Sequence, residues 1–406
     1  MTVILQSKAE LIVSKKDTAR IGSDAPLYII MLAVAIVASN SLVLSTILSD
    51  VATSLGSTSI GISRAVAVYG AGTMVSALCL APHIDRVGAS RALRVGLLVL
   101  AAALLCSAGA TNALMLMGAQ AFAGVSAGII LPASYALATI YAGPKDLSRS
   151  LGKVLFGWSL AFICGIPGLA LISDFLAWRF TYLILLAIAL GVVLELRRAC
   201  DFEHRAANSN SQAGILNVLA CRNVVVLLTV CLCFTTAFYG VFAFLADQMR
   251  QAEVISASAA GAISLAFGIG FAAATPATGL VDRIGPRRLL PAVMFVNASV
   301  YGLMGITSGD YSATLVMVIL WGATTNISLN MIVLLLSQIS SKEKGRILGL
   351  NSATTYLGAT LGVTVAGILY ESLGFRSLLI WALALQVFGA ILTWVAMSPA
   401  VKSELR

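Results

Sequence analysis

The 406-residue sequence has little charge and almost no histidine. Charged residues make up 11% of the chain and there are two histidines, whereas soluble domains are about a quarter charged. Apolar residues make up 59%, more than a soluble fold of this length can remove from water. This composition excludes an ordinary soluble domain and favours a chain that lies in lipid.

Patterned cysteines and a signal peptide are also missing. The seven cysteines lie mostly inside apolar stretches, and Cys231 and Cys233 are separated by one residue, not by the two of a redox or zinc clip. We therefore expect no metal site, no cofactor and no catalytic residue. Residues 1–26 lack the short apolar region and cleavage site of a signal peptide, which predicts a cytoplasmic tail.

Long apolar blocks are abundant. Each is about 20 residues long, the length that a helix needs to cross hydrocarbon. Backbone groups in lipid must be satisfied internally, so the blocks should be helices. We predict an all-α membrane protein with twelve transmembrane helices, near residues 27–48, 61–81, 93–110, 114–138, 154–173, 180–196, 223–245, 256–279, 289–308, 313–337, 347–369 and 377–397.

The basic residues are distributed unevenly over the connections between the blocks. With both termini in the cytoplasm, the cytoplasmic segments hold all but four of the 26 Lys and Arg residues. This bias is typical of inner-membrane proteins. We expect a multi-pass protein of a bacterial-type inner (plasma) membrane, and the net charge of +9 gives no reason to expect nucleic acid as a partner. The four exceptions are Arg64, Arg179, Arg250 and Arg376.

A short charged loop occurs twice. The copies lie 197 positions apart, and the same shift places Asp50 on Asp247 and Arg179 on Arg376. Hydrophobicity alone cannot align charged residues at block ends, so the match predicts an internal duplication. The copies read Asp85-Arg86-Val87-Gly88-Ala89-Ser90-Arg91 and Asp282-Arg283-Ile284-Gly285-Pro286-Arg287-Arg288.

The duplication predicts two six-helix halves of the same orientation. The longest polar stretch lies between them and has no apolar periodicity, which is typical of a solvated connection. The predicted parts are an N-terminal tail (1–26), a six-helix bundle (27–196), a cytoplasmic linker (197–222), a second bundle (223–397) and a C-terminal tail (398–406).

Paired halves, a central linker and an Asp-Arg-x-Gly-x-x-Arg loop after the second and eighth blocks resemble the major facilitator superfamily. The resemblance covers essentially the whole chain. It implies a secondary transporter, not an enzyme, whose halves rock about a central site and expose it to each side in turn. The sequence departs from the family at Ala81 and Thr278, where glycine is usual, and at Ser90, where a basic residue is common.

The fifth block carries Gly165-Ile166-Pro167-Gly168, which resembles the motif of drug and sugar exporters in that superfamily. Leu48–Ala52 and Tyr69 are similar to the sugar-efflux and chloramphenicol-resistance branch. The resemblance implies proton-linked efflux of a small organic compound (a drug, sugar or metabolite). Gly165, Pro167 and Gly168 are the expected hinge, because proline kinks a helix and glycine permits close packing.

One departure leaves proton coupling open. Exporters of this branch usually carry an arginine four residues before the glycine matched by Gly124, and this sequence has Gln120. No block carries a carboxylate at its middle either, although such a group would mark a proton site. An importer or a proton-independent facilitator of a neutral molecule is therefore the alternative.

We interpret the duplicated loop as a cytoplasmic gate. Its acids and arginines can pair across the seam between the halves, and a charge network can bias two states that differ by a few kcal/mol. The alternative is that these charges only set the topology. The gate residues are Asp85, Arg86, Gly88, Arg91, Asp282, Arg283, Gly285 and Arg288.

Asp50 and Asp247 are the candidates for a proton site or an outer gate. They lie at the outer ends of the first and seventh blocks, and Arg64, one turn into the second block, can pair with Asp50. The alternative is that they are simple helix-end charges.

A cavity between the halves should be lined by uncharged side chains. Asparagine and glutamine inside a membrane need partners, and a neutral aromatic-and-amide lining suits an uncharged or weakly amphipathic solute. The candidates are Asn40, Gln120, Tyr135, Phe238, Tyr239, Trp321, Asn326, Asn330, Asn351 and Tyr356. We expect a monomer whose partners are this solute, the bilayer and protons.

Two other functions are weighed. Gly124-Val125-Ser126-Ala127-Gly128 fits the nucleophile-elbow pattern of hydrolases. That pattern needs a strand-to-helix turn, and here it lies inside an apolar block, so a helix-packing face is favoured over an intramembrane hydrolase. The other alternative is a membrane sensor that no longer transports.

Overall fold

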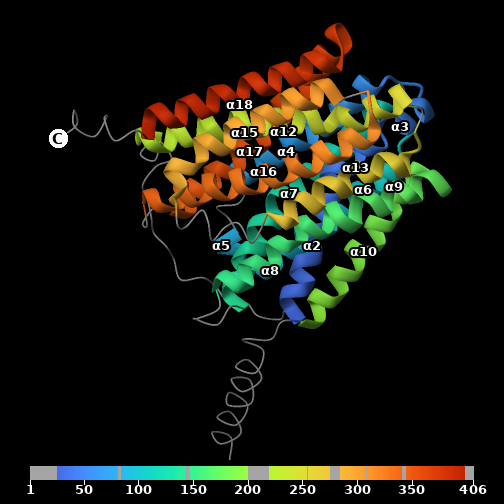
Figure 1. Ribbon diagram of the computed structural model, residues 1–406. Helices are drawn as coiled ribbons and strands as arrows, with labels where there is room; N and C mark the ends of the chain where they lie inside the picture. Colours follow the sequence, from blue (N-terminus) through green and yellow to red (C-terminus); the bar gives the residue numbers. More distant parts are fainter. Residues whose placement is uncertain are drawn as a thin grey trace, which may run out of the picture.

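The computed structural model describes residues 25–80, 84–141, 147–199, 219–253, 255–274, 284–307, 309–340 and 344–397. Within these ranges every regular element is a helix (Figure 1). The N-terminal half comprises α2 (Ala25–Thr46), α3 (Leu48–Ser54), α4 (Ser59–Cys79), α5 (Ile84–Val87), α6 (Ala89–Ala108), α7 (Ala113–Tyr141), α8 (Leu147–Leu160), the π-helical turn η2 (Ala161–Gly165), α9 (Ile166–Phe175) and α10 (Trp178–Ala199).

The described part of the C-terminal half has no counterpart of η2 within its membrane crossings. The helices of this half are α12 (Arg222–Glu253), α13 (Ala257–Ala273), α15 (Pro286–Thr307), α16 (Tyr311–Ile339), α17 (Lys344–Leu373) and α18 (Phe375–Met397). The predicted tails and most of the predicted linker lie outside the described residues, so the boundaries of the domains stay a prediction.

The predicted membrane helices are confirmed. Among the described residues, eleven helical stretches are long and apolar enough to cross a membrane, and α13 is a shorter apolar helix. Together they correspond to the twelve apolar blocks. The agreement has a simple cause, because a chain in lipid must satisfy its backbone within each crossing segment.

The bundle has two ends, which we name after their short helices. Figure 1 shows α3 and α9 at one end, the α3 end, and α5 towards the other, the α5 end. Sequence-distant helices pack along the seam between the halves: α4 on α17, α9 on α13, and α2 on α12. At the α4–α17 contact the Thr360 hydroxyl donates to the Ala67 carbonyl over 3.2 Å.

The fifth membrane crossing is interrupted by η2. Pro167 is the second residue of α9 and lacks an N–H group, so the helix loses a backbone hydrogen bond there. A single wider turn is one way in which a helix absorbs such a defect. Gly165 brings this turn against the Ser39 side chain of α2, and the hinge role of Gly165, Pro167 and Gly168 stays a prediction.

Glycines hold α7 against α4. A Cβ atom at Gly124 would collide with the main chain of Tyr69, and one at Gly128 would collide with the main chain of Thr73 and the side chain of Ser76. Ser126 is fully buried between these glycines, where its hydroxyl donates to the Ala123 carbonyl over 2.6 Å. This stretch is thus a packing face, as small residues at helix contacts predict.

Replacing Gly124 with alanine should destabilise the bundle. Backbone, and no flexible side chain end, lies next to the new methyl group, so we expect the free energy of unfolding to fall by about 1–3 kcal/mol. Thermal unfolding in detergent measures the loss. The matched control is Gly118→Ala on the same helix, where nothing lies within 4 Å. Equal losses in both variants would contradict this packing role.

Candidate functional site

A cavity lies between the two halves. It has a volume of about 170 Å³ and is bounded by α4, α7 and α8 on one side and by α12 and α17 on the other. No charged residue is among the described residues that line it. Aromatic and hydroxyl groups face the space, and those that bear on its chemistry are Thr73, Tyr135, Trp158, Tyr239, Ser352, Thr355 and Tyr356.

Phenol groups dominate the hydrogen bonding of this cavity. The Tyr135 hydroxyl accepts from the Trp158 indole N–H over 3.4 Å, so its own proton is available for another acceptor. The Tyr356 hydroxyl is buried and has no hydrogen-bond partner among the described residues. Buried polar groups are normally paired. An acceptor atom on a bound molecule would satisfy both phenols.

Three of the ten predicted cavity residues line this space: Tyr135, Tyr239 and Tyr356. Asn351 lies one helical turn from Tyr356, and its main-chain carbonyl accepts from the Thr355 hydroxyl over 2.9 Å. Asn330 instead donates to the Asn326 side chain over 2.8 Å on the same helix.

Gln120 and Asn40 do not line the cavity, which corrects that expectation. The Asn40 amide donates to Gln120 over 3.2 Å, and the Gln120 amide donates to the Ser107 hydroxyl over 3.1 Å. These bonds tie α2, α7 and α6 together inside the N-terminal half. The amide groups of buried asparagine and glutamine need hydrogen-bond partners, and Asn40 and Gln120 are bonded to each other.

Phe238 and Trp321 also lie outside the lining, in an aromatic cluster on the seam. Their ring centroids are 5.4 Å apart, and the Trp321 indole N–H donates to the Tyr301 hydroxyl over 3.0 Å. Phe162 of η2 joins the cluster from the other half, with centroid distances of 5.9 Å to Phe242 and 4.8 Å to Phe267. Phe242 of α12 therefore packs against the other half, and Phe238 supports it from the same helix with a centroid distance of 5.6 Å.

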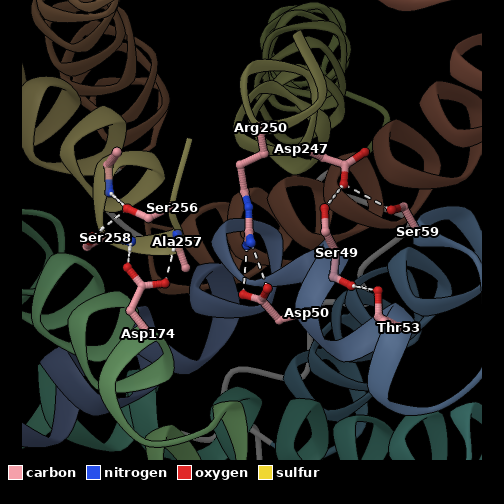
Figure 2. Close-up of polar contacts among 11 residues, drawn as sticks. Ser49, Asp50, Thr53, Ser59, Asp174, Asp247, Arg250, Ser256, Ala257 and Ser258 are labelled. Atoms are coloured by element: carbon pink, nitrogen blue, oxygen red, sulfur yellow. Dashed lines mark hydrogen bonds and ion pairs between the residues drawn. The ribbon is translucent and has the colours of Figure 1, made fainter. Parts of the chain in front are cut away.

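At the α3 end, three carboxylates cross between the halves (Figure 2). We call them and their partners the carboxylate contacts. Asp50 forms a bidentate ion pair with Arg250, at 2.6 and 2.7 Å, the geometry that gives the strongest carboxylate pairing. We predicted Arg64 as the partner of Asp50, and that pairing was wrong. Arg64 is exposed on α4.

Asp247 is the most buried of the three, with 1% of its surface exposed. One oxygen accepts from Ser49 over 2.5 Å and from Ser59 over 2.9 Å, both in the N-terminal half. The other oxygen accepts from Gln251 over 2.8 Å and from Tyr370 over 3.2 Å in its own half. All four donors are uncharged, whereas Asp50 has a cation as its partner.

Asp174, at the end of α9, completes the set and was not among the predicted site residues. Its two oxygens accept from the main-chain N–H groups of Ala257 over 2.9 Å and of Ser258 over 2.6 Å. These are free amides of the first turn of α13, where the helix dipole also favours an anion. The 197-residue shift places Asp174 on Glu371, a match that could have identified it.

The predicted gate lies only partly within the described residues. Gly88 and Gly285 have φ angles of 91° and 92°, a region that favours glycine, so both loop copies turn in the same way. Arg91 and Arg288 are exposed. The structure does not describe the side chains of Asp85 and Arg86, and Asp282 and Arg283 lie outside the described residues.

An all-helical membrane bundle with an uncharged cavity between two halves is the architecture of a membrane transporter. The family model described as Major Facilitator Superfamily matches residues 30–253 and 249–406. The chain therefore belongs to this superfamily of secondary transporters, and the resemblance inferred from the charged loops is confirmed. Membership of a transporter family also replaces the hydrolase alternative.

Individual relatives are distant. The chain is 25% identical to the uncharacterized MFS-type transporter YwfA of Bacillus subtilis (strain 168), over 90% of each chain. It is 30% identical to a probable sugar efflux transporter of Mannheimia succiniciproducens, over 53% of this chain and 54% of that one. A bacterial homologue of the human lysosomal transporter Spinster, solved inward-facing and occupied, matches with a TM-score of 0.75 at 13% identity, covering 91% and 96%. That match shows the fold alone.

Breaking the Asp50–Arg250 pair should open the α3 end. Hydrogen bonds to charged groups contribute about 1.5–3 kcal/mol each, so we expect Asp50→Asn to shift the closed-to-open ratio about tenfold towards open. Spin labels at Arg64→Cys and Ala252→Cys in a cysteine-free background report the separation of the halves. Both positions are exposed.

Asp310→Asn is the control for this experiment. Asp310 is an acid at the same end, but its carboxylate accepts from Ala313 within its own half over 3.0 Å. It should leave the label distances unchanged. If Asp50→Asn gives the same distances as the unsubstituted protein, the pair does not hold the end closed.

Proposed function

We propose that this transporter exports a small, neutral organic molecule in exchange for protons. The observation that carries the proposal is the cavity itself, which the two halves share and whose described lining has phenol donors and no charged residue. A permanently charged cargo would find no counter-ion there, and leaving a charge unpaired in a low-dielectric site is costly. The sugar-efflux name of one distant relative supports the direction.

Orientation follows from the charge distribution. If both termini are cytoplasmic, the α3 end faces outwards, and the carboxylate contacts close the outer side. The cavity lining comes from the C-terminal parts of α4 and α7 and the N-terminal part of α17, which lie towards the α5 end. An exporter takes up its cargo from this side. The duplicated loops are then the gate on that inner side.

Asp247 is the proton carrier in this proposal. It is buried and bound only by uncharged donors, so a proton there leaves no cation unpaired. Protonating Asp50 would instead strand the Arg250 guanidinium. Protonation also removes acceptor capacity for Ser49 and Ser59, which weakens the hydrogen bonds across the seam. Of the two acids weighed from the sequence, Asp247 is the better supported.

A proton-independent facilitator is the second candidate. Gln120 favours it, because this amide replaces the arginine expected in exporters and is occupied by Asn40 and Ser107. Glutamine is uncharged, so unlike arginine it cannot shift the pKa of a nearby carboxylate electrostatically.

Proteoliposomes separate the two functions. The cargo is a neutral compound to which overexpression gives resistance in a susceptibility panel. Vesicles with an acidic lumen should accumulate it from outside, since proton exit drives its entry, and Asp247→Asn should abolish accumulation but keep passive exchange. Asp310→Asn should transport normally. Accumulation that persists after an ionophore collapses the gradient, or none in the unsubstituted protein despite exchange, rejects proton linkage.

The Tyr356 hydroxyl should bind the cargo. Tyr356→Phe removes one buried donor that has no protein partner, so we expect unchanged stability and a several-fold rise in KM, with about 0.5–1.5 kcal/mol of binding lost. Tyr182→Phe is the matched control, because the Tyr182 hydroxyl is also buried without a partner but lies on α10, away from the cavity. An unchanged KM in Tyr356→Phe removes this residue from the site.

A further inference from the structure

A second cavity lies at the rim of the bundle, outside the seam. It has a volume of about 140 Å³ and runs between α15 and α18, which lie side by side along one edge of the molecule in Figure 1. We call it the α15–α18 groove. Gly302 and Gly305 of α15 and Leu379 and Leu383 of α18 line it, and Arg376 in the first turn of α18 supplies its charge.

Two glycines create this groove. A Cβ atom at Gly302 would lie 3.2 Å from Leu383, and one at Gly305 would lie 3.8 Å from Leu379. The 197-residue shift places Leu105 and Ala108 at the equivalent positions of the N-terminal half, and Tyr182 opposite them in place of Leu379. The N-terminal half thus carries larger side chains at the positions where the C-terminal half has the groove.

The arginine at the end of the groove differs between the halves in the same way. Its counterpart Arg179 donates to the Ser54 hydroxyl over 3.2 Å and to the Ala110 carbonyl over 3.0 Å, and lies 4.4 Å from the Trp178 ring. Arg376 is exposed and makes no hydrogen bond or ion pair with the described part of the chain. One copy of the arginine is used by the protein, and the other is available to a ligand.

The surroundings indicate which ligand. Ile306 and Ile380 line the groove and are 77% and 62% exposed, which in a membrane-crossing helix means contact with acyl chains. Arg376 lies in the first turn of α18, and the end of a membrane-crossing helix is where basic side chains reach the lipid head groups. A guanidinium binds phosphate through two parallel hydrogen bonds. We infer that the groove binds one anionic phospholipid, with an acyl chain between α15 and α18 and the phosphate on Arg376.

Lipid retention tests this inference without any transport assay, so it stands or falls apart from the proposed function. The full chain is equilibrated in nanodiscs of phosphatidylglycerol and phosphatidylcholine with identical acyl chains, extracted, and its retained lipids are measured by mass spectrometry. The unsubstituted protein should retain phosphatidylglycerol preferentially. Arg376→Gln should lower that preference about fivefold, which corresponds to about 1 kcal/mol for one basic side chain at an anionic surface. Arg376→Lys should keep most of it.

Arg64→Gln is the matched control, since Arg64 is exposed at the same end on α4, outside the groove. It should leave the preference unchanged. Gly302→Leu introduces the residue that the N-terminal half has at the equivalent position, and it should reduce retention of both lipids. If that variant does not fold, Gly302→Ala makes the same test with a smaller side chain. Equal retention of the two lipids by the unsubstituted protein, or an equal effect of Arg64→Gln and Arg376→Gln, overturns the inference. Displacement by millimolar glycerophosphate also overturns it, because a free phosphate would then suffice.

Discussion

The structure depends on acids that find their donors in the opposite half. Asp50, Asp174 and Asp247 lie at one end of an apolar bundle, where an ionised carboxylate without donors is costly. Each of them accepts hydrogen bonds across the seam: from a guanidinium, from two main-chain amides, and from two hydroxyls. When that end is closed, these carboxylates have hydrogen-bond donors in the opposite half. When it opens, water must replace those donors or the carboxylates must be protonated.

Along α12, the aromatic residue Phe242 lies between Asp247 and the cavity residue Tyr239. Phe162 packs against Phe242 and Phe267 there, and the Trp321 indole N–H of the same cluster donates to the Tyr301 hydroxyl. The cavity then offers hydroxyl donors from both halves. The three acids therefore lie apart from the cavity, and none of them is among its described lining residues.

The helices could be predicted from the sequence, and the contacts between halves only in part. Lipid leaves a crossing segment little choice but to be helical, so composition and block length sufficed. Tyr135, Tyr239 and Tyr356 could be predicted as cavity-lining residues because polar aromatic residues are uncommon inside apolar blocks. Local hydropathy does not indicate which charged residues pair across the two halves, and so Arg64 was considered as the partner of Asp50 in place of Arg250.

The internal duplication also relates a third pair of acids at helix ends. Asp174 matches Glu371 in the same register that aligned Asp50 with Asp247, and this pointed to Asp174 as a helix-end acid of the same kind. The expectation that Gln120 lines the cavity failed for a different reason. A buried amide can bind cargo or a neighbouring helix, and only the positions of Asn40 and Ser107 decide between them.

The wide turn at Ala161–Gly165 has a consequence for the symmetry of the molecule. Its counterpart in α17 is regular helix with Thr364 in place of Pro167, although the register between the halves needs no gap. One wide turn changes the angular phase of all that follows it, since successive residues in a helix are about 100° apart. The part of this crossing that carries Asp174 is thus rotated relative to the part that carries Trp158. A rotation that exchanged the two halves could not superpose this crossing on α17, so the two halves are not structurally equivalent and need not deform alike when they move against each other.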